Sequence, residues 1–195
     1  LQSLYRVDMS NTIVIYHGGC PDGFGAAWSF WNKYKNSVEY YPASHGEPPP
    51  DVSGKDVFIV DFSYKREVLL KMNDSAKSIV LIDHHASAER ESGDLDFCNF
   101  DMNHSGAYLA WDYLFGSENI PPLISYIEDR DLWKWKLPNS NCILSAVDSY
   151  PKDFSKWSEL NSMLSLDHTS EDAGWGFKAL KAEGDAILRY KKNLL

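Results

Sequence analysis

The sequence predicts an α/β fold: a mostly parallel five-stranded sheet with helices on both faces, followed by a C-terminal helical segment. Strand-length apolar runs rich in Val and Ile occur at 12–16, 56–60 and 78–82. Such runs are typical of strands buried on both faces of a parallel sheet. The runs alternate with segments whose apolar residues recur at helical spacing, which indicates crossover connections between parallel strands.

The first half of the chain supplies most of the predicted sheet. Within 22–35, Ala26, Phe30 and Tyr34 recur at helical spacing, so this helix is expected to pack on the sheet. A later loop contains three consecutive prolines, which forbid regular structure, and its His45 is expected to be exposed. The elements expected up to residue 83 are strand 12–16, helix 22–35, strand 38–41, strand 56–60, helix 64–73 and strand 78–82.

The second half is expected to be mainly helical. Residues 86–96 are charged and are expected to be irregular, whereas Ser105 resembles an N-cap and Pro122 suits the first turn of a helix. We expect Trp133 and Trp135 in the core, with stacking on a nucleobase as the alternative. The elements expected here are strand 97–100 and helices 106–115, 123–128, 153–164 and 175–195.

Length and charge limit the function classes. A chain of 195 residues can form one sizeable core and a small appendage. Its formal charge of −9 argues against binding of duplex DNA, because duplex affinity depends on neutralising phosphates. A small phosphorylated substrate is still compatible, since bound divalent cations would invert the local charge. No apolar segment reaches the length of a membrane span, so no membrane partner is expected.

The cysteines and the N-terminal segment bear on the compartment and on the domain limits. The chain has three cysteines, Cys20, Cys98 and Cys142. Their odd number and wide spacing predict reduced thiols and a cytoplasmic location. Residues 1–8 precede Met9, which resembles a natural start, and we expect them to be a remnant of expression.

Acidic and imidazole side chains follow three of the predicted strands. His17 ends the first strand, Asp61 follows the third, and Asp83-His84-His85 follows the fourth. In open α/β sheets, ligands bind beyond the carboxyl ends of the strands. Mixed carboxylate and imidazole sets bind hard to intermediate divalent metals. The sequence therefore predicts a metal site at this edge of the sheet.

The order of these motifs resembles that of the DHH phosphoesterase superfamily, over roughly residues 12–135. The superfamily includes single-strand exonucleases, nanoRNases and pAp phosphatases, exopolyphosphatases and family II inorganic pyrophosphatases. Its first motif usually has two Asp separated by one residue, but here Cys20 stands at the first of these positions. Asp131 is the alternative to Asp129 as the acid of the fourth motif. The motifs come in this order: His17 with Asp22, then Asp61, then Asp83-His84-His85, then Asp129.

The resemblance implies a DHH-type, divalent-metal-dependent phosphohydrolase whose catalytic domain spans residues 9–150. Members of this kind use two ions, usually Mn²⁺, with Mg²⁺, Co²⁺ or Zn²⁺ as substitutes, and activate water between them. The substrate would be a short single-stranded oligonucleotide, pAp, a cyclic dinucleotide, pyrophosphate or polyphosphate. The sequence does not choose among these.

The resemblance also implies a role for each site residue. Asp61 would bridge the two ions, Asp83 would orient a histidine and His85 would face the substrate phosphate. Arg130 would pair with an acid or hold a phosphate. Cys20 is either a thiolate ligand, which would favour zinc, or a small buried residue with water as the ligand in its place. The implied metal ligands are His17, Cys20, Asp22, Asp61, His84 and Asp129.

Two alternatives stay open at this point. Because the first motif is altered, the chain could be a catalytically weak phosphate- or nucleotide-binding module. Relatives usually carry a second domain with a Gly-rich motif, whereas 151–195 shows only helical patterns. We expect this segment to be a helical extension or a linker to a missing second domain, which would leave the metal site in an open groove. Its last helix is expected to expose an apolar face, which would allow a homodimer.

Overall fold

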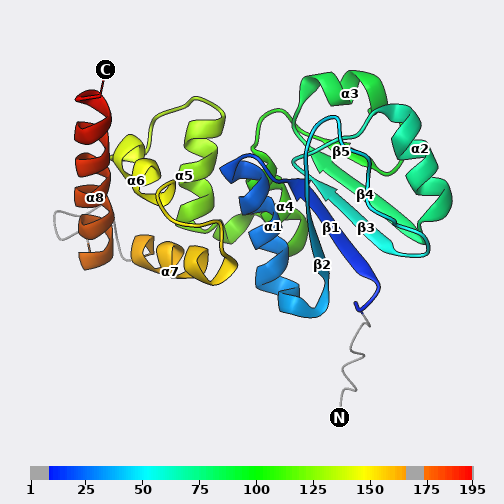
Figure 1. Cartoon of the computed structure of the whole chain (residues 1–195), viewed down its shortest axis with the longest axis horizontal. Coiled ribbons are helices and arrows are strands. Elements are labelled where there is room, and N and C mark those ends of the chain that lie inside the picture. Colours follow the sequence, from blue (N-terminus) through cyan, green and yellow to red (C-terminus); the bar gives the residue numbers. More distant parts are fainter. Residues whose placement is uncertain (1–8, 166–173, 195) are drawn as a thin grey trace, which may run out of the picture.

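The computed structural model describes residues 9–165 and 174–194 and contains a five-stranded sheet of order β2-β1-β3-β4-β5 (Figure 1). Every neighbouring pair of strands is parallel, which confirms the predicted fold class. Residues 1–8 lie outside the described part. The strands are β1 (Thr12–His17), β2 (Glu39–Ala43), β3 (Asp56–Val60), β4 (Ser78–Asp83) and β5 (Cys98–Phe100).

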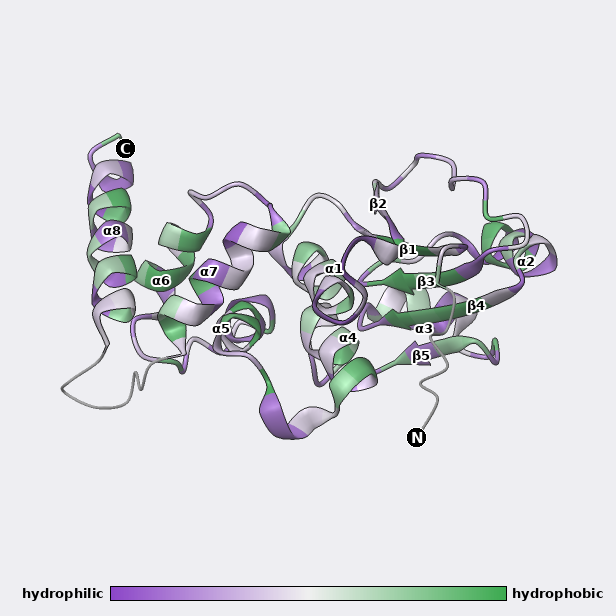
Figure 2. Ribbon diagram, turned by 90° about the horizontal axis from the view of Figure 1, so that it is seen from below, coloured by the Kyte–Doolittle hydropathy of each residue, from purple (hydrophilic) through white to green (hydrophobic). Residues whose placement is uncertain are grey.

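Helices cover both faces of the sheet because side chains alternate along each strand. Val14 and Tyr16 of β1 join a core with α1 and α4, whereas Ile13 and Ile15 join a second core with α2. Figure 2 shows the apolar strands between these helices. The helices flanking the sheet are α1 (Pro21–Tyr34), α2 (Arg66–Ser75), α3 (Ala86–Ser92) and α4 (Gly106–Phe115), with 3-10 turns η1 (Lys35–Ser37) and η2 (Ser117–Asn119).

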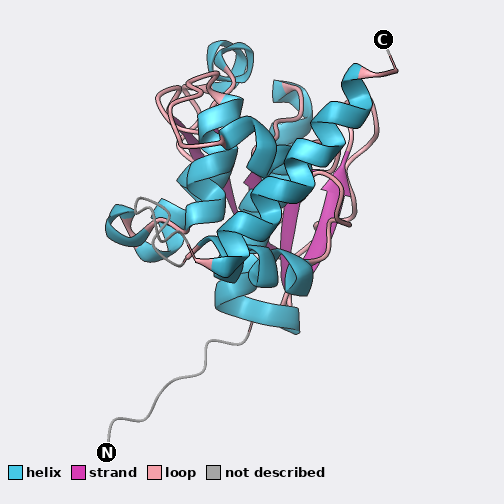
Figure 3. Cartoon of the chain, turned by 90° about the vertical axis from the view of Figure 1, so that its left-hand side faces the viewer, coloured by secondary structure: helices cyan, strands magenta, loops and turns pink. Residues whose placement is uncertain are grey.

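A helical part follows the sheet, as predicted, and its last helix lies across the others (Figure 3). Phe177 and Leu180 of this helix are buried, and a Cβ at Gly184 would overlap the carbonyl oxygen of Cys142. The expectation of an exposed apolar face is therefore wrong for Phe177 and Leu180, whereas Trp175, Tyr190 and Leu194 are exposed. The helices are α5 (Pro122–Asp131), α6 (Ser140–Val147), α7 (Phe154–Leu164) and α8 (Trp175–Lys192).

Some local expectations are confirmed and others are wrong. Ser105 Oγ accepts a hydrogen bond from the Tyr108 N–H, so the predicted N-cap of α4 is present. Segment 86–96 is helical at α3, where Ser92 is the only buried residue, so no apolar periodicity marked the helix. Helix α6 was not predicted either. Within the described residues, no helix is long and apolar enough to cross a lipid bilayer.

The two outer strands of the sheet are irregular or short. Strand β2 contains Pro42, and β5 has three residues. Proline has no N–H to donate to a further strand. The central strands β1, β3 and β4 are more apolar, and they end side by side at the edge that carries the candidate site.

Candidate metal centre

Three adjacent strands bring acidic and imidazole side chains to one edge of the sheet. His17 ends β1, Asp61 directly follows β3, and Asp83 ends β4. Because β1, β3 and β4 are parallel neighbours, their carboxyl ends meet at this edge, as the sequence predicted. Asp22 enters the same place from the first turn of α1.

One group of ligand atoms surrounds a single carboxylate oxygen of Asp61. Oδ2 of Asp61 lies 3.8 Å from His17 Nδ1 and accepts a hydrogen bond of 3.3 Å from the Cys20 thiol. The Cys20 sulfur also lies 3.2 Å from His17 Nδ1 and accepts the N–H of Gly23, which caps α1. These three side chains offer atoms within 4.8 Å of one another, close enough to share one cation.

A second group forms around His84 on the other side of the same carboxylate. Nε2 of His84 lies 3.1 Å from Asp61 Oδ1, 3.4 Å from Asp22 Oδ2 and 3.6 Å from Asp131 Oδ2. Asp61 therefore contacts both groups through different oxygens. This is the placement expected for a carboxylate shared between two cations.

Backbone geometry fixes the positions of Asp22 and Asp61. The carboxylate of Asp22 accepts the N–H groups of Gly106 and Ala107 at the start of α4, at 2.7 and 2.9 Å. Helix N-termini stabilise negative charge in this way. Asp61 has a left-handed backbone with a φ of 51°, and its N–H donates to the Ile82 carbonyl. A Cβ on Gly106 would lie 2.5 Å from Asp61 Oδ1, so only glycine leaves room for this carboxylate.

Gly106→Ala should lower the melting temperature of the metal-free protein by several degrees. Overpacking of this kind costs about 1–3 kcal/mol, which corresponds to roughly 2–4 °C per kcal/mol in a chain of this size. Gly19→Ala is the matched control, because its Cβ would meet nothing closer than 3.4 Å. Thermal unfolding measured in chelator would test this, and equal melting temperatures for the two variants would contradict the close approach.

Asp83 holds the two histidines of the Asp83-His84-His85 motif. Its Oδ1 accepts the backbone N–H of His84 at 2.8 Å and lies 2.7 Å from His85 Nδ1. The other oxygen, Oδ2, is buried and has no hydrogen-bond partner among the described residues. The hydrogen bond to Asp83 raises the pKa of His85 to about 9, so its imidazole is positively charged at neutral pH.

Asp131, and not Asp129, lies in the cluster as the acid of the fourth motif. Asp129 does not join the cluster: its carboxylate accepts the N–H groups of Lys136 and Leu137, at 2.7 and 3.2 Å. Asp131 lies beside His84 instead, so the alternative acid occupies the site. The cause is helical geometry, because two positions along a helix correspond to a rotation of about 200°.

Arg130 does not reach the cluster either. Its guanidinium pairs with both carboxylate oxygens of Asp148, at 2.8 and 3.1 Å, on the wall of a separate cavity of about 500 Å³. The expected role in pairing with an acid therefore applies to Asp148.

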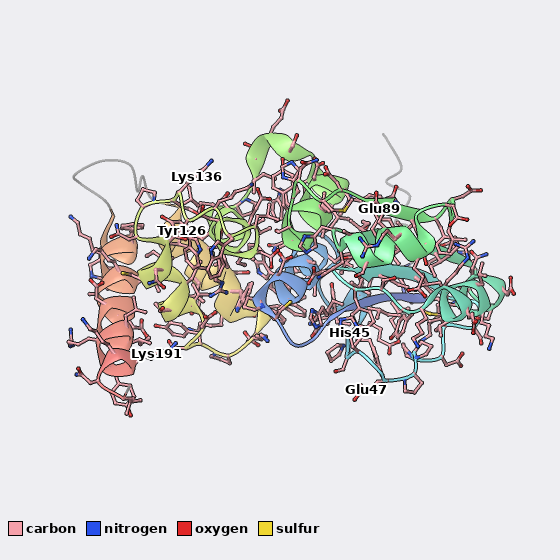
Figure 4. The ribbon with its side chains drawn as sticks, turned by 90° about the horizontal axis from the view of Figure 1, so that it is seen from above. His45, Glu47, Glu89, Tyr126, Lys136 and Lys191 are labelled. Atoms are coloured by element: carbon pink, nitrogen blue, oxygen red, sulfur yellow. The ribbon has the colours of Figure 1, made fainter. Side chains whose placement is uncertain are left out.

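A cavity of about 250 Å³ opens next to this cluster. Asp61, Asp83 and His85 line it together with His45 and Lys65. Sequence reasoning assigned no role to His45, which lies in the loop after β2 (Figure 4). Its ring is exposed, as expected, but its centroid is 5.3 Å from that of His17. No sequence signal marked this position, because a proline-rich loop gives no periodicity.

Electrostatics distinguish this cluster from an ordinary polar surface. Burial, followed by the charges of Asp61 and Asp131, raises the pKa of Asp22 well above its usual value. Burial, followed by the charge of Asp61, raises the pKa of the Cys20 thiol to about 12. Burial disfavours the protonation of His84, but the hydrogen bond to Asp61 raises its pKa overall.

The donor set fits divalent cations. Asp22, Asp61 and Asp83 are each at most 2% exposed as whole residues. Among the described residues, no Lys or Arg forms an ion pair with any of them. Buried carboxylates are normally paired with cations or bound to metals. The unpartnered oxygen of Asp83 and the crowded carboxylates around His84 therefore fit bound positive charge.

Comparisons with known proteins give relatives without an assigned activity. No protein-family model matches the chain. The "Uncharacterized protein R106" of Acanthamoeba polyphaga mimivirus is 29% identical over 173 residues, covering 80% of this chain and 41% of that protein. A solved structure of an uncharacterized protein from Helicobacter pylori G27 is 14% identical, with a TM-score of 0.63 over 93% of this chain and 62% of that chain. The chain therefore spans less than two thirds of either relative, and the second likeness concerns the fold alone.

Proposed function

We propose that this chain is a divalent-metal-dependent phosphohydrolase of the DHH type, which cleaves a phosphodiester or phosphoanhydride bond in a small phosphorylated substrate. The observation that carries the proposal is the position of Asp61. Its two oxygens contact separate groups of metal-ligating atoms at the carboxyl ends of parallel strands. Two divalent ions held in this way would supply Lewis-acid charge stabilisation and activate water for phosphoryl transfer.

Each ion would have its own set of side chains. His17, Cys20 and Asp61 would hold one ion. Asp61 would also hold the second ion, together with Asp22, His84 and Asp131. Asp131 takes the place in this second set that the motif order gave to Asp129. A bound cation would deprotonate the Cys20 thiol, which is neutral without metal.

The cavity beside the cluster is the proposed place for the substrate phosphate. Asp83 holds the His85 ring through Nδ1 by a hydrogen bond of 2.7 Å, which leaves Nε2 as the ring nitrogen that would donate to a phosphate oxygen. His45 and Lys65 line the same cavity and would add hydrogen-bond donors, while Glu91 places one further carboxylate there. In this arrangement His85 binds and orients the phosphate, and Asp83 acts as a positioning residue for it.

Chelation should abolish hydrolysis of phosphoesters, and Mn²⁺ should restore it. Ca²⁺ should restore it poorly, because Ca²⁺ prefers six to eight oxygen ligands and this set contains imidazole and thiol groups. Turnover of a substrate panel in chelator, followed by titration with each ion, would test this. Full activity in excess chelator would contradict the proposal. Stoichiometric Mn²⁺ binding without turnover would favour a phosphate-binding module instead.

We also propose a cytoplasmic location. Cys20, Cys98 and Cys142 are all free thiols in the structure, and such thiols persist where the surroundings are reducing.

A further inference from the structure

Two exposed tryptophans follow the metal-ligating end of α5. The side chain of Trp133 is 77% exposed and that of Trp135 is 36% exposed, so the expectation that they belong to the core is wrong. Their rings meet edge to face, with centroids 5.3 Å apart. Large aromatic side chains are expensive to leave in water, and a paired, exposed arrangement indicates a surface that binds something.

The backbone of this loop is unusual. Trp133 and Trp135 have φ angles of +55° and +49°, a left-handed conformation that bulky residues rarely adopt. Residues held in such conformations cluster at functional sites, where the surrounding structure imposes them. The sequence offers no glycine or asparagine at either position, so conformational preference does not explain the loop.

Asp129 imposes this conformation through four hydrogen bonds. Its carbonyl oxygen accepts the N–H groups of Lys134 and Trp135, at 2.8 and 3.1 Å. Its carboxylate accepts those of Lys136 and Leu137. Asp129 is buried and lies outside the metal cluster, and it fixes the conformation of the loop that carries Trp133 and Trp135.

The loop lies next to the proposed reaction site. Asp131 Oδ2 is 3.6 Å from His84 Nε2 in the metal cluster. Trp133 is two residues further along, so its Cα is at most about 7.6 Å from that of Asp131. An indole at this distance can contact the group attached to a phosphate held at the cluster.

Cations alternate with the two indoles. Lys134 pairs with Glu128 at 2.8 Å, whereas Lys136 forms no ion pair among the described residues and lies on the outside of the helical part (Figure 4). Aromatic side chains interleaved with basic ones are typical of proteins that bind single-stranded nucleic acid. Bases stack on the rings, and the cations attract the phosphates.

We propose that residues 132–137 form a nucleobase platform, in which a base of the substrate stacks on the exposed indole of Trp133, Trp135 packs edge to face against that indole, and the phosphate lies at the metal centre. This inference rests on the proposed function and narrows its substrates to nucleotides and short single-stranded oligonucleotides. Base-free polyphosphate or pyrophosphate would gain nothing from the platform. Stacking tolerates every base, so the platform gives preference for a nucleobase without preference for a sequence.

Hydrolysis of a 5′-phosphorylated dinucleotide and of tripolyphosphate by the same variants would test the platform. Trp133→Ala should raise the KM for the dinucleotide by about 5- to 150-fold, the range expected for one lost stack, and Trp135→Ala should raise it less; both variants should leave the KM for tripolyphosphate unchanged. Trp133→Phe should recover most of the loss. Trp175→Ala is the matched control, because Trp175 is 79% exposed on α8. Equal effects on both substrates would overturn the platform.

A binding measurement in chelator separates this inference from the proposed function. A dinucleotide containing 2-aminopurine changes its fluorescence when it stacks on an indole. The wild type and Trp175→Ala should quench it, and Trp133→Ala should need at least about fivefold more protein for the same quenching. Quenching without any metal-dependent hydrolysis would refute the hydrolase and leave the platform standing. Absence of quenching by the wild type would refute the platform.

Discussion

Asp61→Asn should reduce metal-dependent hydrolysis by about a thousandfold or more. Changes to groups that merely support metal ligands cost about 10- to 100-fold, and Asp61 faces both proposed ions. Its Oδ1 lies 3.1 Å from His84 Nε2, and its Oδ2 accepts the Cys20 thiol at 3.3 Å. Asparagine keeps the size of the side chain and tolerates the left-handed backbone, with a φ of 51°, but it removes the shared charge.

The same strand provides a control for Asp61. Asp56 lies at the opposite end of β3 and pairs with Lys77 on the surface, so Asp56→Asn should change turnover less than about twofold. Calorimetric titration with Mn²⁺ should show fewer or weaker sites in Asp61→Asn than in Asp56→Asn. If Asp61→Asn kept near-normal turnover with two intact Mn²⁺ sites, Asp61 would not be the shared ligand.

Asp129→Ala should lower the free energy of unfolding, whereas Asp131→Ala should lower the turnover. Asp129→Ala leaves the N–H groups of Lys136 and Leu137 without their acceptor, which costs about 2–4 kcal/mol of unfolding free energy. Asp131→Ala should instead lower turnover by at least about a hundredfold, as expected when a group touching the reacting charge is lost. Its metal-free stability should not fall, because Asp131 raises the pKa of Asp22 by charge repulsion.

Two measurements on each variant decide this assignment. Denaturant unfolding in chelator gives the stability, and Mn²⁺-dependent turnover at saturating metal gives the activity. The assignment predicts an unstable Asp129→Ala variant and a stable, inactive Asp131→Ala variant. A stable, inactive Asp129→Ala variant beside an active Asp131→Ala variant would restore Asp129 as the metal ligand.

Sequence patterns were enough to predict those elements whose structure depends on neighbouring residues in the chain. The apolar strands ending at His17, Asp61 and Asp83 are visible because buried parallel strands tolerate few polar residues. The N-cap at Ser105 is equally local. The convergence of the strand ends then follows from parallel pairing, so the sequence predicts most of the acidic and imidazole cluster at this edge of the sheet.

The remaining features depend on geometry that the sequence does not display. Asp129 and Asp131 are both acids in one helical turn, and only the direction of the helix decides which one meets His84. Trp133 resembles a core residue by composition, but the backbone N–H groups that donate to Asp129 turn its loop outward. His45 reaches the cavity through a loop of irregular conformation, which no periodic pattern can describe.

The outer strands also affect how the protein behaves at high concentration. An exposed edge strand is a template on which another chain can add by backbone pairing, and this is a common route to aggregates. Pro42 interrupts the donor row of β2, and the three residues of β5 offer too short a ladder to recruit a partner. The sheet is thereby protected at both margins, and the apolar central strands can be strongly β-forming without seeding fibrils.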